Sequence, residues 1–263
     1  MKIVEPKVEL IAETNILLDD VWSVDDVEAK WGMELDEYST ESEDLIEFAG
    51  RACYQSFDKP NPATRRNEDY LRRTLFEQGH WSIAEHATAT LYFTGVSRAF
   101  THELIRHRHL SYSQLSQRFV DESDANIVLP PALRNSKSTV VYLPGECHDD
   151  VEGDLAEATE WWGSDAMLNY KSLVGALSDE GLPRKQAREA ARALLPNMIE
   201  TRIVVTGNLR VWHEVIQRRT APDADAEMQE VMELAREQLE LVSPVIFGKN
   251  VPEKEEKQLN SAA

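Results

Sequence analysis

The chain has 263 residues and a formal net charge of −19, and 42% of its residues are hydrophobic. This acidic balance argues against broad nucleic-acid binding, which requires a basic face. The N-terminus lacks the apolar run of a signal peptide, and no window approaches the roughly 20 apolar residues of a membrane span. We therefore expect a cytoplasmic protein with no nucleic-acid or membrane partner.

The first half of the chain is predicted to combine helices with short strands. In helix 43–54 the apolar face is expected at Leu45, Phe48, Ala49 and Ala52, with Thr40 and Ser42 as candidate caps. The expected elements are a strand at 7–12, an acidic loop or insertion at 19–44, helices at 43–54 and 67–78, a loop at 59–62, and a strand at 87–94 that Gly95 ends.

The second half is predicted to be richer in helices. Asn208 is a good N-cap for a helix that runs through Arg219. The expected elements are helices at 97–106, 154–177, from Pro183 to before Pro196, at 208–219 and at 223–242, and a strand at 199–206. The class is therefore α+β: a helix-rich single domain over 1–248 with a small antiparallel sheet, followed by a charged, disordered tail at 249–263.

Residues 106–119 form the polar segment that most favours a ligand site. The segment holds three Arg, two His, three Ser and two Gln. Guanidinium groups match phosphate oxygens, and Ser and Gln supply further donors and acceptors, so the combination suits a nucleotide. A polar helix end with surface salt bridges is the alternative.

Three other clusters are weaker signals. Arg184, Arg188 and Arg192 lie on one helical stripe, which is either a solvated face or part of a site. The stretch 80–86 holds two histidines at a spacing that differs from the HExxH zinc motif, so the edge of a cofactor pocket is favoured over a metal site. The helix start at Asn208 offers backbone donors to an anion. The sequence contains neither a GxGxxG motif nor a P-loop, nor any CxxC pair, so we predict no bound metal.

Arg106-His107-Arg108, followed after seven residues by Ser116, resembles the signature of the flavin-dependent thymidylate synthases. The resemblance spans most of residues 45–240, looks closest to actinobacterial members, and is weak at 14–44 and 134–180. It implies a homotetramer in which FAD binds between subunits and dUMP stacks on the flavin ring. It further implies conversion of dUMP to dTMP, with methylenetetrahydrofolate as one-carbon donor and FAD, reduced by NADPH, as hydride source.

The resemblance also implies which residues bind each ligand. Two positions depart from the family: Phe119 replaces a frequent Tyr, and Glu214 replaces an Asn or His that contacts flavin, so either His213 substitutes or Glu214 itself makes the contact. The implied FAD contacts are His80, Ser82, Arg106, His107, Arg108, Gln114, Asn208, Leu209, Arg210 and Glu214. The implied dUMP contacts are Glu103, Leu104, Ile105, Arg106, Gln114, Leu115, Ser116, Gln117, Arg118, Arg192 and Arg219.

Methylation at carbon 5 of uracil requires that carbon to become electron-rich. Neither Cys53 nor Cys147 lies in a motif suited to a nucleophile. Arg219 matches the arginine that polarises the uracil ring, and we assign it the catalytic role. Ser116 is either a nucleophile or a binding residue, and binding is favoured because no base is identified beside it. A nucleotide-binding regulatory protein without catalysis is the main alternative function, and an RNA-binding module is disfavoured by the net charge.

Overall fold

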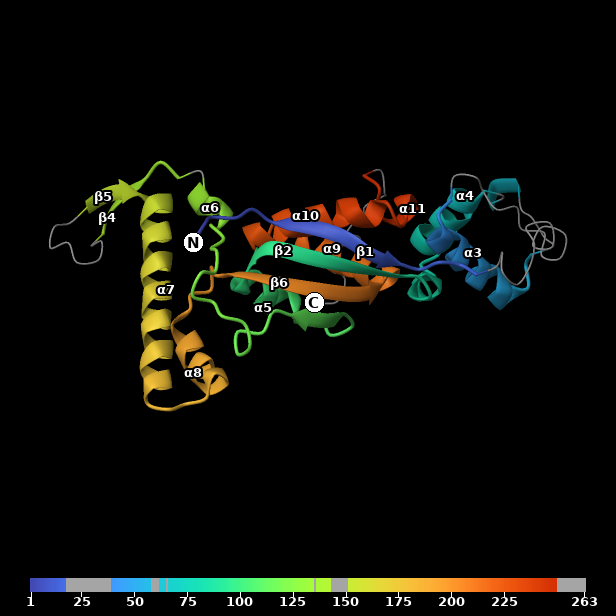
Figure 1. Cartoon of the computed structure of the whole chain (residues 1–263). Helices are drawn as coiled ribbons and strands as arrows, with labels where there is room; N and C mark the ends of the chain where they lie inside the picture. The colour runs from blue at the N-terminus through green and yellow to red at the C-terminus, as the bar shows by residue number, and fades with distance from the viewer. Residues whose placement is uncertain (18–38, 58–61, 65, 135, 143–150, 250–263) are drawn as a thin grey trace, which may run out of the picture. The chain divides into compact units, whose positions relative to one another are not determined.

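The computed structural model of the chain describes residues 1–17, 39–57, 62–64, 66–134, 136–142 and 151–249 (Figure 1). The chain packs as two units, each drawn from three stretches. Unit 1 is Met1–Glu9, Tyr92–Val205 and Arg218–Leu234, and unit 2 is Leu10–Leu91, Thr206–Gln217 and Ala235–Ala263. The single domain over 1–248 stays a prediction, as does the disordered tail, because residues 250–263 lie outside the described ones.

A four-stranded sheet is built in the order β1-β2-β6-β3. Its strands are β1 (Lys7–Glu13), β2 (Thr88–Ser97), β6 (Glu200–Asn208) and β3 (Ser111–Gln114). Burial alternates along β2 and β6, with Leu91, Phe93, Ile203 and Val205 fully buried, so one face of the sheet is core. The strands predicted at 7–12, 87–94 and 199–206 are confirmed, whereas β3 was not expected.

Gly95 does not end its strand, contrary to the prediction. Strand β2 continues to Ser97, and Gly95 lies inside it at φ +63°. A Cβ atom built at this position would collide with the carbonyl oxygen of Glu5. Glycine is therefore required here by close backbone approach and by left-handed geometry.

In unit 2, helix α3 (Glu41–Tyr54) begins with a capping box between Thr40 and Glu43, so the acidic loop was predicted about four residues too long. The rest of that loop, 18–38, lies outside the described residues, as does most of the predicted loop at 59–62. The predicted apolar face is wrong, because the four apolar residues named for it are only half-buried. The buried face instead carries charged residues, including Glu43, Glu47 and Arg51.

A buried ion pair explains why charged residues occupy that face. Arg51 binds Glu47 one helical turn earlier, with the two side chains 8% and 3% exposed. Asn67 donates to the second oxygen of Glu47 at 2.8 Å. Asn67 begins helix α4 (Asn67–Leu71), which continues as a π-helical turn over Arg72–Glu77 and closes at Gly79 with φ +73°, as predicted for a single helix at 67–78.

The peripheral helices of unit 1 follow the prediction closely. Helix α5 (Arg98–Leu104) is capped by Ser97, α7 (Leu155–Asp179) is capped by Asp154, and α8 (Arg184–Ala191) follows Pro183 and runs into a 3-10 turn at Arg192–Leu194. Helix α8 lies along α7 (Figure 1). The short helix α6 (Pro131–Arg134) and the antiparallel hairpin of β4 (Thr139–Tyr142) and β5 (Val151–Asp154) were not expected.

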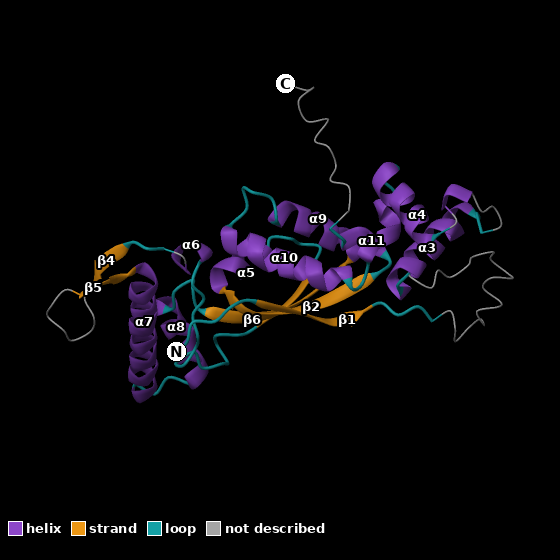
Figure 2. Cartoon of the chain, turned by 90° about the horizontal axis from the view of Figure 1, so that it is seen from above, coloured by secondary structure: helices purple, strands orange, loops and turns teal. Residues whose placement is uncertain are grey.

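The C-terminal helices are α9 (Leu209–Arg219), α10 (Ala226–Glu240) and α11 (Pro244–Phe247). Glu227 of α10 accepts hydrogen bonds from the backbone and hydroxyl of Ser97 at 2.8 and 2.6 Å, which ties α10 to the start of α5. Figure 2 shows α5 and the first part of α10 on the same side of the strands.

The α+β class is confirmed. Among the described residues, no helix is both long and apolar enough to cross a membrane.

Candidate functional site

The end of α9 brings Arg219 against the end of α5. Arg219 Nε donates to His107 Nε2 at 2.8 Å, Nη2 donates to the carbonyl oxygen of Glu103 at 3.2 Å, and Nη1 lies 3.4 Å from the Glu103 carboxylate. The Arg219 side chain is 18% exposed. A guanidinium has five N–H donors, so three are committed to the protein and two, one on each terminal nitrogen, have no acceptor among the described residues.

A turn after α5 carries Arg106, His107 and Arg108. The Tyr112 hydroxyl lies 2.7 Å from the carbonyl oxygen of Leu104 and 2.8 Å from that of His107, and it spans the turn. Burial raises the pKa of Tyr112 to about 12, so the hydroxyl keeps its hydrogen as a donor. The turn that presents the signature residues is therefore held by a side chain of the following strand, β3.

His107 is neutral in this setting. Burial first, then the charges of Arg219 and Arg218, lower its pKa from 6.5 to about 4, against an opposing effect of Glu103. Its Nε2 faces the guanidinium of Arg219 as an acceptor. Arg106 and Arg108 on either side are exposed and, within the part of the chain that the structure describes, form no ion pair with a carboxylate.

A groove of about 500 Å³ lies in unit 1 between α5, the 117 turn and the end of α8. It brings together two residues that the sequence assigned to dUMP, Gln117 and Arg192. Arg98 and His102, which line the same groove from α5, were missed. Both residues precede the recognised signature. Their position on the helix that leads into the predicted segment from Glu103 to Arg106 was the only signal that could have included them.

The two arginines of the groove give it a positive character. Burial and the charge of Arg192 lower the pKa of Arg98, which the buried carboxyl of Glu122 partly offsets. Among described residues, neither arginine has a carboxylate within ion-pair distance. Two like charges held near one another, with no carboxylate of the described residues in direct ion-pair contact, favour an anionic ligand even though Glu189 also lines the groove.

The remaining predicted residues of unit 1 have mixed settings. Gln114 donates to Thr101 Oγ1 at 2.8 Å and lies 3.4 Å from Thr201 Oγ1. Ser116 is half-buried, and its hydroxyl makes no hydrogen bond to any described residue. Leu115 donates its backbone N–H to the backbone carbonyl oxygen of Arg202 at 2.9 Å. Leu104 is fully buried, so only its backbone could reach a ligand, whereas Ile105 is exposed.

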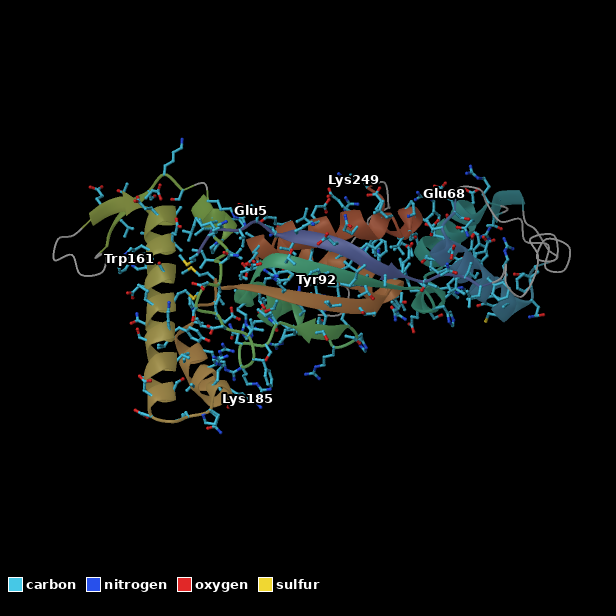
Figure 3. All side chains as sticks on the ribbon, viewed as in Figure 1. Glu5, Glu68, Tyr92, Trp161, Lys185 and Lys249 are labelled. Carbon is cyan, nitrogen blue, oxygen red and sulfur yellow. The ribbon has the colours of Figure 1, made fainter. Side chains whose placement is uncertain are left out.

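The arginine stripe of α8 splits into different roles. Arg188 is buried and donates to the carbonyl of Phe119 at 2.7 Å and to Asp121 at 2.6 Å, so it holds the 119–121 turn. Arg192 lines the groove. Phe119 is 61% exposed, and Lys185 (Figure 3) lies 5.0 Å from the centre of its ring. Arg118 is 4.0 Å from Glu189 at the rim.

The flavin residues predicted around α9 lie in unit 2. Arg210 donates to Glu85 at 2.6 Å and to Glu214 at 3.0 Å, so Glu214 already has a cationic partner. His213, the alternative contact, is buried and stacks on Trp81 with ring centres 4.2 Å apart. Of the two residues, only Glu214 is exposed.

The start of α9 offers fewer free donors than expected. Asn208 accepts from the backbone of Val211 at 2.9 Å, which confirms it as the cap. The backbone N–H of Leu209 is already bound to the carbonyl of Ala87 at 2.9 Å, and the Leu209 side chain is fully buried. Ser82 and His80 are exposed, and His80 stacks on Tyr54 at 6.2 Å. Within the described ranges, no three His, Cys, Asp or Glu side chains are grouped to hold a metal ion.

The sequence and fold match a known family. The model of the family described as thymidylate synthase complementing protein matches residues 34–245. A flavin-dependent thymidylate synthase of Mycobacteroides abscessus is 46% identical over 249 residues, covering 94% of this chain and 90% of the relative. One of Corynebacterium aurimucosum is 46% identical over 225 residues, covering 81% and 82%.

A solved structure shares the fold. The flavin-dependent thymidylate synthase of Helicobacter pylori, complexed with FAD and dUMP, superposes with a TM-score of 0.61 at 20% identity. The match covers 94% of this chain and 100% of that chain. At this identity the likeness supports the fold and not individual contacts.

Proposed function

The chain belongs to the flavin-dependent thymidylate synthase family, as the resemblance predicted, and we propose that it converts dUMP to dTMP by reductive methylation. Methylenetetrahydrofolate supplies the one-carbon unit, and NADPH reduces the enzyme's FAD. When bound, FAD supplies the hydride, and the protein supplies binding, orientation and electrostatics. The cytoplasmic location remains a prediction.

The observation that carries the proposal is the setting of Arg219. Two donors of its guanidinium remain after His107 and Glu103 have taken three. A guanidinium stays charged at working pH and can stabilise negative charge on a ring carbonyl and ring nitrogen without titrating. Increased electron density at carbon 5 of uracil follows from that stabilisation, and no cysteine adduct is needed.

We assign the phosphate of dUMP to the groove in unit 1. Arg98 and Arg192 offer positive charge there, Gln117 offers an amide, and the one lining carboxylate, Glu189, lies 4.0 Å from Arg118. Forked N–H donors suit phosphate oxygens. The Ser116 hydroxyl makes no hydrogen bond to a basic side chain among the described residues, so we assign it to binding and not to nucleophilic attack.

Two groups of residues fit FAD chemically. Arg106 and Arg108 are exposed cations that form no ion pair with a carboxylate of the described residues, which suits a pyrophosphate. Ser82, His80 and Glu214 are exposed, Arg210 beside Glu214 is half-buried, and together they offer both donors and acceptors to a ring or ribose. Because the family resemblance implies that FAD binds between subunits, we also propose a homotetramer.

The direct test is a dUMP methylation assay with FAD, NADPH and methylenetetrahydrofolate. We expect yellow purified protein that bleaches with NADPH, forms dTMP and scatters light as a tetramer. A protein that binds dUMP but cannot be loaded with FAD would be the regulatory alternative, and an active flavin-loaded monomer would remove the tetramer from the proposal.

A further inference from the structure

The contact between Arg219 and His107 constrains the histidine as well as the arginine. A guanidinium only donates, so the imidazole nitrogen that faces it must carry a lone pair. The separation of 2.8 Å between Arg219 Nε and His107 Nε2 therefore requires a neutral ring with its hydrogen on Nδ1. The charged groups around this ring are Arg219 and Arg218 of α9 and Glu103 of α5, two cations against one carboxylate.

The backbone around His107 is fixed as firmly as the ring. Its N–H donates to the carbonyl of Leu104 at 3.1 Å, and its own carbonyl accepts from Leu110 at 3.1 Å and from the Tyr112 hydroxyl at 2.8 Å. Glu103 holds the other end of the guanidinium. Glu103 and His107 thus contact the Arg219 guanidinium from two sides. Both residues belong to the segment at the end of α5 that the Tyr112 hydroxyl fixes by hydrogen bonds.

We infer that His107 is a positioning residue for Arg219, which it orients by accepting from Nε as the neutral Nδ1–H tautomer. In this role it sets the direction of the two guanidinium donors that remain for a ligand. The inference rests on the proposed function, because only an arginine that polarises uracil needs a fixed direction. The Nδ1–H group stays available to another acceptor, so the flavin contact that the resemblance implies would use the opposite nitrogen.

Two substitutions of His107 distinguish the role of its Nε2 atom from that of its Nδ1 atom. A glutamine amide reaches the place of Nε2 and can still accept from Arg219, whereas an asparagine amide reaches only the place of Nδ1. At saturating FAD, we expect His107→Asn to lower dUMP methylation by about 10²-fold, as expected when a catalytic group is misdirected. His107→Gln, which keeps the acceptor toward Arg219 but loses the Nδ1 contact, should turn over clearly faster than His107→Asn, and the exposed neighbour change His109→Asn is the matched control. Activity retained in the asparagine variant and lost in the glutamine variant would overturn the inference.

A double substitution shows whether His107 acts through Arg219. In an Arg219→Lys background, His107→Asn should cost little more, because residues that act as one unit are not additive. If the two losses multiply, His107 acts independently and the inference fails while the proposed function stands. If Arg219→Lys alone keeps the wild-type rate, the proposed role of Arg219 fails instead.

Nitrogen NMR of enzyme with labelled histidines determines the tautomer of His107 independently of any activity measurement. The His107 signal, assigned by its loss in His107→Gln, should show a protonated Nδ1 and a bare Nε2 at pH 6. An imidazolium signal, or a hydrogen on Nε2, would contradict the inference whatever the rates.

Discussion

Replacing Arg219 by lysine keeps the charge and removes the planar fork. The lysine ammonium carries its donors on one nitrogen and cannot reproduce the three contacts to His107 and Glu103. The two donors that point away from the protein are lost as a preorganised pair. Losing one preorganised donor to a developing anion costs about 10²–10³ in rate, and we expect a loss of that size in dUMP methylation by Arg219→Lys.

The same change should leave the fold intact. The Glu103 carboxylate is 48% exposed, and an ion pair with so exposed a partner contributes at most about 1 kcal/mol. The thermal unfolding temperature of Arg219→Lys should therefore stay close to that of wild type. A lower methylation rate would then not result from unfolding of the variant.

The assay compares dUMP methylation with flavin reduction by NADPH in the absence of dUMP. Only the first involves the pyrimidine, so only the first should fall. Arg218→Lys is the matched control, since its side chain leaves the helix about 100° away. Near wild-type methylation by Arg219→Lys, or an equal loss of flavin reduction, would refute the assignment and make Arg192 the next candidate.

Three further outcomes are expected. Ser116→Ala should weaken dUMP binding and slow turnover but still form dTMP, and a Ser116 adduct in wild-type enzyme by mass spectrometry would contradict its binding role. Arg51→Met should lower the free energy of unfolding by about 3–5 kcal/mol in denaturant titration, because it removes one partner of a buried ion pair; Arg73→Met, on an exposed side chain, is the control. Burial, reinforced by Glu200 and Asp121 against Arg98, raises the pKa of Glu122 from 4.5 to about 7. Because the pKa of this carboxyl is raised, the folded chain binds more protons than the unfolded chain between pH 4.5 and 7. The free energy of unfolding therefore falls as pH rises through that window, and this group changes it no further above pH 7. The stability of wild type relative to Glu122→Gln should fall across that window, and a difference that is flat with pH would show that Glu122 does not titrate there.

Most helices could be predicted because their ends carry their own chemistry. Thr40, Asp154 and Asn208 each accept a backbone hydrogen bond at a helix start, and each is a residue type that caps helices. The face of α3 was predicted wrongly for the opposite reason. Its buried side carries Glu47 and Arg51, which form an ion pair with each other. Hydrophobic periodicity does not detect a buried pair of charged residues.

The strand that carries part of the candidate site escaped prediction as well. Strand β3 reads Ser-Tyr-Ser-Gln and has no alternation of apolar and polar residues, since it lies at the edge of the sheet. The resemblance implied Gln117 and Arg192, whereas α5 reaches the same groove only through folding, so the position of Arg98 and His102 just before Glu103 was the one weak signal for them in the linear sequence. The burial of His213 likewise depends on a stack with Trp81, far away in the chain.

The passage from β6 into α9 contains no connecting loop, since the strand ends at Asn208 and the helix begins at Leu209. One inserted or deleted residue in the helix would turn everything beyond it by about 100° around the axis. Such a change would carry Arg219 off His107 and bring polar side chains into the place of Val215 and Ile216. Descendants of this sequence can therefore exchange exposed side chains of α9 that bind no ligand, but they cannot change its length. Gaps should be absent from this stretch when distant relatives are aligned, even where few of its letters agree.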